Sequence, residues 1–600
     1  MGFLGLSILL FSGTWREPLT SVASGGSPDV GIFIWFLRWV PFALGHMQNP
    51  LVTTYLDSPG GVNAMWNSSV LLAGLLAAPF TAVLGPIFSY NLLLTFAVAT
   101  SGWCAFLAAR RYVASPLPAV LGGLLYGFSP YMVAQSLGHL HLTLAFIPPL
   151  MLLLLDEILI RQRLSKVKMG VLLGLLATAQ LLLAEELLAT EVITAILGTA
   201  VLATLHPAMV RSHRRYALSA LGVAAVVFVA LSAVPLAIQF LGPERVSGPV
   251  QIRNTYVTDL LGFIVPTGQQ LFAPAAAVRL TQDFSGYPPE WDAYLGLPLL
   301  AVLGYTTARF WRLPLVRVVS TLLLLLAVLS LGPTLHVAGH TTVLPVVVLA
   351  LAAPLIRRVI PLRVTLYVFP ATWVGLALAP VLSSVLPARL MLYVFLFAAL
   401  LLAVFVQEVV KHSQASVRTA LLVGLALLPL IPRIPFPSEP VAVPSFFTSG
   451  AAQQQIPDGS VALVLPYSCL ASSKAMVWQA ASNMQFRMPE GYALNPGPSF
   501  NAPVSLTGNL VRGLESGMEP PALTSELRSQ VFADLTLWKV RTIIIGPMSH
   551  QDQAVAFFSA LTNRAPKSGG GVFLWTFEGP SRPAAIHGTA FGLPPGLLGR

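Results

Sequence analysis

The chain has 600 residues, of which 55% are hydrophobic and only 10% are charged, and its mean hydropathy is +0.76. Charged residues make up about a quarter of a typical soluble domain, so this composition excludes a soluble protein and indicates a polytopic membrane protein. The net charge of +11 comes from short basic clusters between apolar segments, a pattern typical of cytoplasmic loops and not of a nucleic-acid-binding groove. The two cysteines, Cys104 and Cys469, exclude a disulfide framework.

A helix that crosses a bilayer needs about 20 apolar residues, and the sequence contains about 13 candidate segments. We therefore predict a mainly α-helical membrane domain over residues 1–434, in which residues 1–14 form a short first span or the core of a signal anchor. The other candidates are 87–109, 116–135, 141–160, 169–187, 188–206, 215–241, 293–309, 314–331, 341–356, 364–384, 388–406 and 416–432.

The basic clusters orient these spans, because cytoplasmic loops carry an excess of Lys and Arg. Clusters recur at every second loop, from Arg110 and Arg111 to Lys411, so segment 87–109 is expected to run from outside to inside. Another crossing at residues 67–85 would invert everything downstream. We therefore predict a re-entrant or surface-lying hairpin there, which is tolerable only where other helices cover it.

This orientation places loops 15–86 and 242–292 on the external face, together with everything after about residue 434. Residues 435–458 are rich in Pro and Ser and indicate a linker. Residues 459–600 then predict a small extracytoplasmic α/β domain with a flexible C-terminal tail. Its expected strands are 460–466, 540–546 and 572–577, and its expected helices lie near 475–484 and 550–563.

Asp29 precedes an amphipathic run that contains the aromatic residues Phe33, Trp35 and Phe36. Such aromatics are typical of the headgroup level of a membrane. Two interpretations of Asp29 stay open, and they are compatible. It is either an N-cap of the following helix, or a general base that deprotonates an acceptor hydroxyl while a lipid phosphate leaves.

Other polar residues on the expected external face are candidates for binding or catalysis. Asp57 is a second-choice catalytic residue, although Asp-Ser-Pro-Gly-Gly is also good turn chemistry. Asn63 and Trp66 would suit sugar or acceptor binding, but an aromatic belt has the same composition. Glu185 and Glu186 interrupt an apolar run, which favours a catalytic or acceptor-binding role unless an external turn solvates them.

Phosphate recognition needs cations or histidines, and the external face carries four candidates. They are His139, His141, Arg245 and Arg253, whose alternative roles are a polar cap for the histidines and surface ion pairs for the arginines. Glu290, Trp291 and Asp292 end the 242–292 loop and are candidate sugar or acceptor ligands. Two His residues at i and i+2 without a nearby carboxylate are a weak metal signal, so a divalent metal is not favoured and no other cofactor is predicted.

These motifs occur in an order that resembles the GT-C class of polytopic glycosyltransferases, and within it bacterial YfhO-like and related membrane proteins. The segments that carry the resemblance are the short first span, Pro28-Asp29 before Ile34-Trp35-Phe36-Leu37, Asn49-Pro50 through Pro59-Gly60-Gly61-Val62-Asn63, Tyr90-Asn91-Leu92 before Arg110-Arg111, Gly127-Phe128-Ser129-Pro130 before Gly138-His139, and Glu290-Trp291-Asp292-Ala293-Tyr294-Leu295-Gly296.

The resemblance implies a plasma (inner) membrane enzyme that transfers a sugar from a polyprenyl-phosphate-linked donor to an extracytoplasmic glycan, lipid or protein acceptor. It also implies that Asp29 is the base. Several GT-C families carry Asp-x-Asp or Glu-x-Asp, whereas only Val30 and Gly31 follow Asp29 here, so a mechanism with a single carboxylate and no metal suits the sequence.

Two other functions stay open at this point. A transporter or flippase of a lipid-linked precursor is disfavoured, because transporters tend to show repeated halves and this sequence shows no visible repeat. A non-catalytic cell-envelope scaffold would need no convergence of the polar residues. The enzyme hypothesis, by contrast, predicts that Asp29 lies on the wall of a cavity open to the external leaflet.

Overall fold

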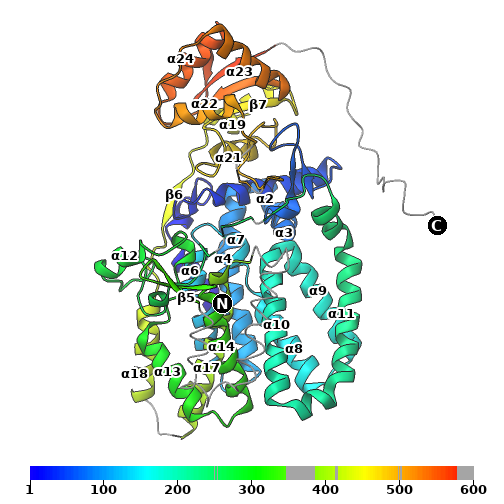
Figure 1. Ribbon diagram of the computed structural model, residues 1–600, viewed down its shortest axis with the longest axis vertical. Coiled ribbons are helices and arrows are strands. Elements are labelled where there is room, and N and C mark those ends of the chain that lie inside the picture. Colours follow the sequence, from blue (N-terminus) through cyan, green and yellow to red (C-terminus); the bar gives the residue numbers. More distant parts are fainter. Residues whose placement is uncertain are drawn as a thin grey trace, which may run out of the picture. The chain divides into compact units, whose positions relative to one another are not determined.

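The computed structural model describes residues 1–577 except 249, 253, 346–384, 413–416, 498 and 501–502. The chain divides into two compact units (Figure 1). The first, here called the helical unit, contains residues 1–37, 65–442 and 494–499. The second, here called the α/β unit, contains residues 38–64, 443–493 and the described residues from 500 on.

Among the described residues, seven helical segments are long and apolar enough to cross a membrane. Each overlaps a predicted span, and most of the observed ends lie within a few residues of the predicted ones. The sixth segment begins earlier than predicted. The segments are Pro86–Arg110 (α4), Pro116–Gln135 (α5 and α6), Leu140–Arg161 (α7, α8 and a π-helical turn), Lys166–Leu183 (α9), Glu185–Leu205 (α10), Pro207–Leu241 (α11) and Pro387–Lys411 (η9 and most of α17, Met391–His412).

Shorter helices complete the described part of the helical unit. They are α1 (Gly2–Leu10), α2 (Asp29–Gly45, which continues into the α/β unit), α3 (Leu71–Leu84), α12 (Ala275–Thr281), α13 (Gly296–Arg309), α14 (Pro314–Ser330) and α18 (Val417–Leu427). Predicted span 364–384 and most of 341–356 lie outside the described residues. The described start of the latter is a strand, β5 (His340–Pro345), paired with β4 (Thr334–Val337), so the prediction of a helix from residue 341 is wrong.

Within the segment 67–85, for which a hairpin is predicted, Leu71–Leu84 form the single helix α3, so the hairpin is wrong, and whether the segment is re-entrant or lies on the surface stays a prediction. Pro79 lies inside this helix, where it removes one backbone hydrogen bond without ending the helix. The helix ends at Gly85, whose φ of +87° is accessible to glycine at little cost. Pro86 then begins α4 at a position where a missing N–H does no harm.

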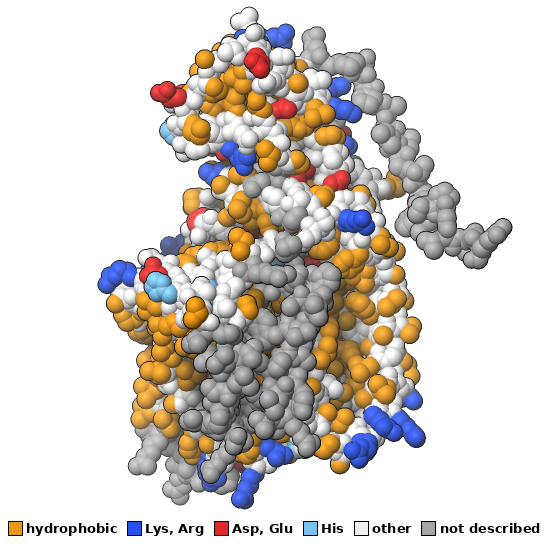
Figure 2. All heavy atoms as spheres, viewed as in Figure 1, with side chains coloured by type: hydrophobic (Ala, Val, Ile, Leu, Met, Phe, Trp, Pro, Cys, Tyr) orange, Lys and Arg blue, Asp and Glu red, His pale blue; other side chains and the backbone are white. Residues whose placement is uncertain are grey.

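The helices pack closely where small residues face each other. A Cβ atom added at Gly174 of α9 would lie 2.7 Å from the carbonyl oxygen of Ala224 in α11, and one at Gly170 would lie 2.4 Å from that of Ala220. The outward face of α11 is apolar, with Val226 exposed by 69%. Figure 2 shows this face covered by hydrophobic side chains, as expected for a surface in contact with lipid.

The α/β unit contains a four-stranded sheet with the order β7-β8-β10-β9. The expected strands correspond to β7 (Val461–Leu465), β8 (Val540–Ile545) and β10 (Val572–Thr576), and β9 (Lys567–Gly569) completes the sheet. Strands β7 and β8 are parallel, and the other neighbours are antiparallel. The helices of this unit are α19 (Ser445–Thr448), α20 (Ala451–Gln455), α21 (Lys474–Ala481), α22 (Leu506–Glu515), α23 (Ser525–Leu537) and α24 (Gln551–Thr562).

Part of the predicted external loop 15–86 belongs to this α/β unit. The carbonyl oxygen of Tyr55 accepts hydrogen bonds from the backbone N–H of Met488 (3.0 Å) and from Nε2 of Gln479 (3.0 Å). Residues 38–64 therefore add to the C-terminal fold, which the boundaries predicted from composition alone did not anticipate. The predicted flexible tail lies largely outside the described residues.

Candidate functional site

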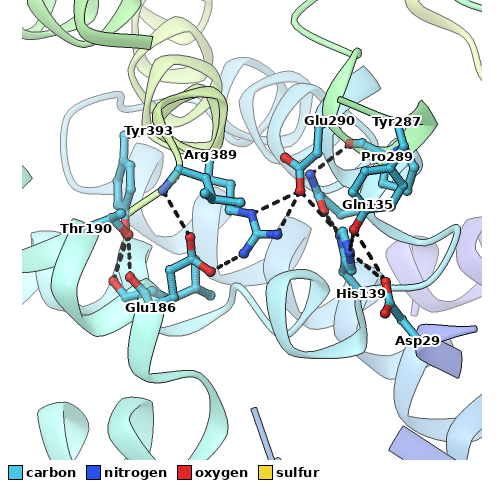
Figure 3. A network of polar contacts seen from close by, with 12 residues as sticks. Asp29, Gln135, His139, Glu186, Thr190, Tyr287, Pro289, Glu290, Arg389 and Tyr393 are labelled. Atoms are coloured by element: carbon cyan, nitrogen blue, oxygen red, sulfur yellow. Dashed lines mark hydrogen bonds and ion pairs between the residues drawn. The ribbon is translucent and has the colours of Figure 1, made fainter. Parts of the chain in front are cut away.

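A continuous chain of polar contacts runs through the helical unit from Asp29 to Glu186 (Figure 3). Its members come from segments that are far apart in the sequence. Asp29 begins α2, His139 lies between α6 (Pro130–Gln135) and α7 (Leu140–Thr143), and Glu186 lies in the first turn of α10. Tyr287 and Glu290 belong to the loop before α13, and Arg389 lies in the 3-10 turn before α17.

The local sequence brings Asp29 and His139 together. The break in predicted span 116–135 comes from Ser129 and Pro130: the Ser129 hydroxyl accepts a hydrogen bond from the Met132 N–H (3.3 Å), and α6 begins at the proline. The turn after α6 contains Gly138, where an added Cβ would lie 2.8 Å from the Cβ of Ser27. Glycine therefore allows this turn to approach the segment that precedes α2.

His139 is the centre of the network. Its Nε2 atom lies 3.2 Å from Oδ2 of Asp29 and also contacts the hydroxyl of Tyr287. Its Nδ1 atom lies 2.5 Å from Oε1 of Gln135. Because Nε2 of Gln135 donates to the carbonyl oxygen of Pro289 (2.9 Å), Oε1 of Gln135 is the acceptor. Nδ1 of His139 therefore carries a proton, and Nε2 faces Asp29 and Tyr287.

Arg389 connects two carboxylates in the interior. Its Nε and Nη2 atoms lie 3.1 and 2.8 Å from Oε1 of Glu290, and its Nη1 atom contacts Oε2 of Glu186. Oε1 of Glu290 is also 3.8 Å from Nδ1 of His139. A buried guanidinium that is shared by two carboxylates is strongly stabilised only while all three groups are present.

The network is partly exposed at both of its ends, by 17% at the Asp29 side chain and by 20% at that of Glu186. The side chains of His139 and Glu290, in contrast, are 4% and 1% exposed. Ser27 donates a hydrogen bond from its hydroxyl to Oδ2 of Asp29 (3.0 Å), and the same hydroxyl accepts one from the N–H of Asp29 (3.2 Å). A small molecule that reaches the Asp29 end would therefore meet a carboxylate that is already oriented.

Residues 30–409 match the model of a family described as a domain of unknown function (DUF6311). The chain belongs to the DUF6311 family. No functionally curated protein matches it. The family differs from the YfhO-like group suggested by the sequence, and that finer relationship stays a prediction.

Several solved structures are similar to this DUF6311 chain. The apo oligosaccharyltransferase of Archaeoglobus fulgidus is 13% identical with a TM-score of 0.47, and the similarity covers 94% of this chain and 70% of that one. AglB from the same organism, in complex with an inhibitory peptide and a dolichol-phosphate, is 14% identical with a TM-score of 0.45, and the similarity covers 94% of this chain and 71% of that one. ArnT from Cupriavidus metallidurans bound to undecaprenyl phosphate is 11% identical with a TM-score of 0.42, and the similarity covers 95% of this chain and 96% of that one. With TM-scores below 0.5, these similarities carry no conclusion about the activity of the DUF6311 chain.

The other predicted residues of the helical unit lie around the network or away from it. His141 is buried and stacks on Phe33 with ring centroids 5.2 Å apart. Phe33 is itself buried, as are Trp35 and Phe36, so these aromatics pack inside the protein, and their placement at the headgroup level stays a prediction. Glu185 begins α10 with a single residue between it and the end of α9, and it is partly exposed.

The 242–292 loop contributes Glu290 to the network. The two residues that follow it, Trp291 and Asp292, form hydrogen bonds within the loop and stabilise its conformation. Oδ2 of Asp292 accepts hydrogen bonds from Thr267 and Gln270, both at 2.9 Å. Nε1 of Trp291 donates to the carbonyl oxygen of Ser285 (3.2 Å). Burial raises the pKa of Asp292 to about 6.

The remaining predicted residues are not in the network. Trp66 donates from Nε1 to the carbonyl oxygen of Gln239 (2.6 Å) within the helical unit. Arg245 is exposed, and Arg253 lies outside the described residues. Asp57 and Asn63 belong to the α/β unit: Asp57 lies in a turn closed by a hydrogen bond from the Gly61 N–H to its carbonyl oxygen, and Asn63 is in β3 (Val62–Asn63).

Sequence reasoning missed Arg389, Tyr287 and Gln135. A signal for Arg389 was present, because this arginine lies at the start of the apolar run 388–406, on the side expected to be external. An ionisable residue in or next to a membrane span is by default a candidate for a functional role. Tyr287 and Gln135 carried no comparable signal. In the described part of the chain, no group of three His, Cys, Asp or Glu side chains converges so as to hold a metal ion.

Proposed function

We propose that the protein is a membrane glycosyltransferase that transfers a sugar from a polyprenyl-phosphate-linked donor to an extracytoplasmic glycan, lipid or protein acceptor. The observation that carries the proposal is the accessible carboxylate of Asp29, held 3.2 Å from the imidazole of His139 at the end of a buried ionic network. The order of motifs that resembles the GT-C class and the apolar helices around the site support the same proposal.

Asp29 would act as the general base. Its carboxylate takes the proton of the acceptor hydroxyl, the acceptor oxygen forms a bond to the anomeric carbon of the sugar, and the bond from that carbon to the phosphate oxygen breaks. The electron pair of the broken bond leaves on the lipid phosphate. Such a base is effective when it lies within about 3 Å of the hydroxyl it deprotonates.

His139 and Arg389 would be positioning residues. His139 would help to fix the Asp29 carboxylate through Tyr287, whose hydroxyl contacts Nε2 of His139 and lies 3.4 Å from Oδ2 of Asp29, while Nδ1 of His139 is held by Gln135. Arg389 is paired with Glu186 and Glu290, so its charge is already compensated. It is therefore better suited to holding the network together than to binding a donor phosphate. For the donor phosphate we retain Arg245, which is exposed.

The Asp29→Asn variant tests the proposal. The protein is reconstituted in proteoliposomes with the lipid-linked sugars extracted from its host membranes, and free polyprenyl phosphate is measured by mass spectrometry. We expect the release to fall by about 100-fold or more, since loss of a general base typically costs 10²–10⁴-fold. The control Asp283→Asn changes an exposed aspartate of the 242–292 loop and should release at the wild-type rate.

The outcome also separates the alternative functions. Undiminished release by Asp29→Asn would contradict the assignment of the base. Movement of the lipid-linked sugar across the bilayer without release of polyprenyl phosphate would instead support a flippase. The proposal further places the α/β unit outside the plasma membrane, which protease protection of its loops in sealed vesicles would check.

A further inference from the structure

The helical unit contains a cavity of about 1290 Å³ that the Asp29 network does not use. Its walls come from α8 (Ile147–Asp156), α9, α10, α11, α14 and α17. The walls are mainly aliphatic and aromatic, as represented by Leu152, Ile196, Leu221, Phe228, Leu322 and Phe397. Pockets for small molecules usually measure about 300–1,000 Å³, so this cavity is large enough for a lipid chain.

Glu191 differs from the other ionisable side chains that line the cavity, which are Asp156, Arg161, Arg163 and His206. Asp156 and Arg161 pair with each other at 2.6 Å, His206 lies 3.5 Å from Arg317, and Arg163 is exposed. Glu191 lines the cavity from α10, it is 6% exposed, and neither of its carboxylate oxygens has a hydrogen-bond partner within the described part of the chain. The hydroxyl of Thr194, one turn further along the same helix, also lines the cavity and likewise lacks a partner among the described residues.

The neighbouring polar groups of α10 are satisfied, which sets Glu191 and Thr194 apart. Thr190 hydrogen-bonds the hydroxyl of Tyr393 at 2.8 Å, and Thr199 donates to the carbonyl oxygen of Ala195 at 2.8 Å. Burying a polar group without a partner is costly, and an ionisable group inside a membrane domain is functional by default. Two such groups, one turn apart on one cavity wall, indicate a polar contact point for a ligand.

The chemical nature of Glu191 and Thr194 indicates which kind of ligand they would bind. A hydroxyl group satisfies a carboxyl group in either protonation state, because it donates to a carboxylate and accepts from a carboxylic acid. It also pairs with the threonine hydroxyl. A phosphate, in contrast, would bring a second negative charge to a carboxylate in apolar surroundings. We propose that the cavity binds a lipid alcohol, whose hydroxyl contacts Glu191 and Thr194 and whose chain fills the apolar part.

Glu191 and Thr194 make no contact with the Asp29 network that the structure describes, although Tyr393 borders both. The inference does not depend on the proposed transferase activity. The test uses tritiated hexadecan-1-ol with the purified full-length protein in detergent. We expect saturable binding in which unlabelled hexadecan-1-ol competes at least about 2-fold better than hexadecane or hexadecyl phosphate, since a buried hydrogen bond contributes about 0.5–1.5 kcal/mol.

Four variants locate the site. Glu191→Leu should weaken binding by about 5- to 30-fold, whereas Glu191→Gln, which can still donate and accept, should stay within about 3-fold of wild type. Thr194→Val should weaken binding, and its matched control Thr199→Val should not, because the hydroxyl of Thr199 is already bonded within the helix.

A cavity-filling variant keeps the test decisive if Glu191→Leu does not fold. Gly198 lines the same cavity, and an added Cβ there meets only Leu322 at an ordinary 3.6 Å, so Gly198→Leu should weaken binding while Glu191 stays intact. The proposal is overturned if hexadecane or hexadecyl phosphate competes as well as the alcohol. It is also overturned if the folded Glu191→Leu or Gly198→Leu variant binds the alcohol as wild type does.

Discussion

The Nε2 atom of His139 lies 3.2 Å from Oδ2 of Asp29, and this contact joins the turn after α6 to the start of α2. The ring cannot rotate freely, because its Nδ1 atom is bonded to Gln135. The accessible carboxylate is therefore held in one orientation by this buried ring together with Tyr287, and the orientation is set before a substrate arrives. Such preorganisation is what a general base requires.

Replacing His139 should consequently lower the rate without preventing binding. For His139→Ala we expect kcat for release of polyprenyl phosphate to fall by about 10- to 100-fold, as expected for a loss of orientation, with KM for the donor changed by less than about 2-fold. Steady-state kinetics in proteoliposomes measures both constants. His340→Gln, which alters an exposed histidine of β5, is the control. A rise in KM at constant kcat would show that His139 binds substrate instead.

Arg389 should be important for stability. Arg389→Met leaves the buried carboxylate of Glu290 and the partly exposed one of Glu186 without their cation, and breaking a buried pair such as Arg389–Glu290 typically costs about 3–5 kcal/mol. Thermal unfolding in detergent measures the loss. Arg163→Met, at an exposed arginine, should change the unfolding temperature little.

The triple variant Glu186→Gln/Glu290→Gln/Arg389→Met separates the cost of unpaired charges from the cost of lost shape. We expect it to recover most of the lost stability, because it removes the two carboxylates along with the guanidinium. If Arg389→Met is as stable as Arg163→Met, the ionic network does not hold these segments together.

The sequence predicted the helical spans well because crossing a membrane depends mainly on local composition. Segments such as 169–187 and 215–241 are predominantly apolar, and α9 and α11 overlap them. The helix ends were less accurate, since caps and tight joints decide them. Glu185 and Glu186, for example, were expected in a turn, but α10 begins at Glu185 with a single residue between it and the end of α9.

The candidate site was only partly predictable. The loop charges placed Asp29, His139 and Glu290 on one face of the membrane, and these residues do meet. The distances between them depend on how the helices pack, which no local pattern contains. For the same reason the sequence grouped Asp57 with them, whereas packing assigns residues 38–64 to the α/β unit.

Asp292 should make the stability of the protein depend on pH. Burial raises its pKa from 3.8 to about 6, although Gln270 and Thr267 donate hydrogen bonds that favour the charged form. The folded state then holds a proton that the unfolded state has already lost, so the free energy of unfolding falls as pH rises from about 4 to about 6. That rise in pKa corresponds to a loss of about 3 kcal/mol.

The Asp292→Asn variant should remove this dependence, because an amide oxygen still accepts both hydrogen bonds and does not ionise. We expect the variant to gain stability relative to wild type as the pH rises from 4 to 7, by up to about 3 kcal/mol. Unfolding temperatures over this pH range measure the effect. Asp283→Asn is the exposed control, and an Asp292→Asn profile parallel to wild type would show that Asp292 is not the group responsible.

The contact between α9 and α11 should depend on the absence of a side chain at Gly174. An added Cβ would lie 2.7 Å from both the carbonyl oxygen of Ala224 and the Cβ of Val227, so a backbone must move. Gly222, on α11, has nothing within 4 Å of an added Cβ and is a matched control. Both substitutions by alanine gain about 1 kcal/mol of helix propensity, so their difference isolates the clash. We expect Gly174→Ala to unfold more easily than Gly222→Ala by about 1–3 kcal/mol. Equal unfolding temperatures for the two variants would mean that the helices can separate at no cost.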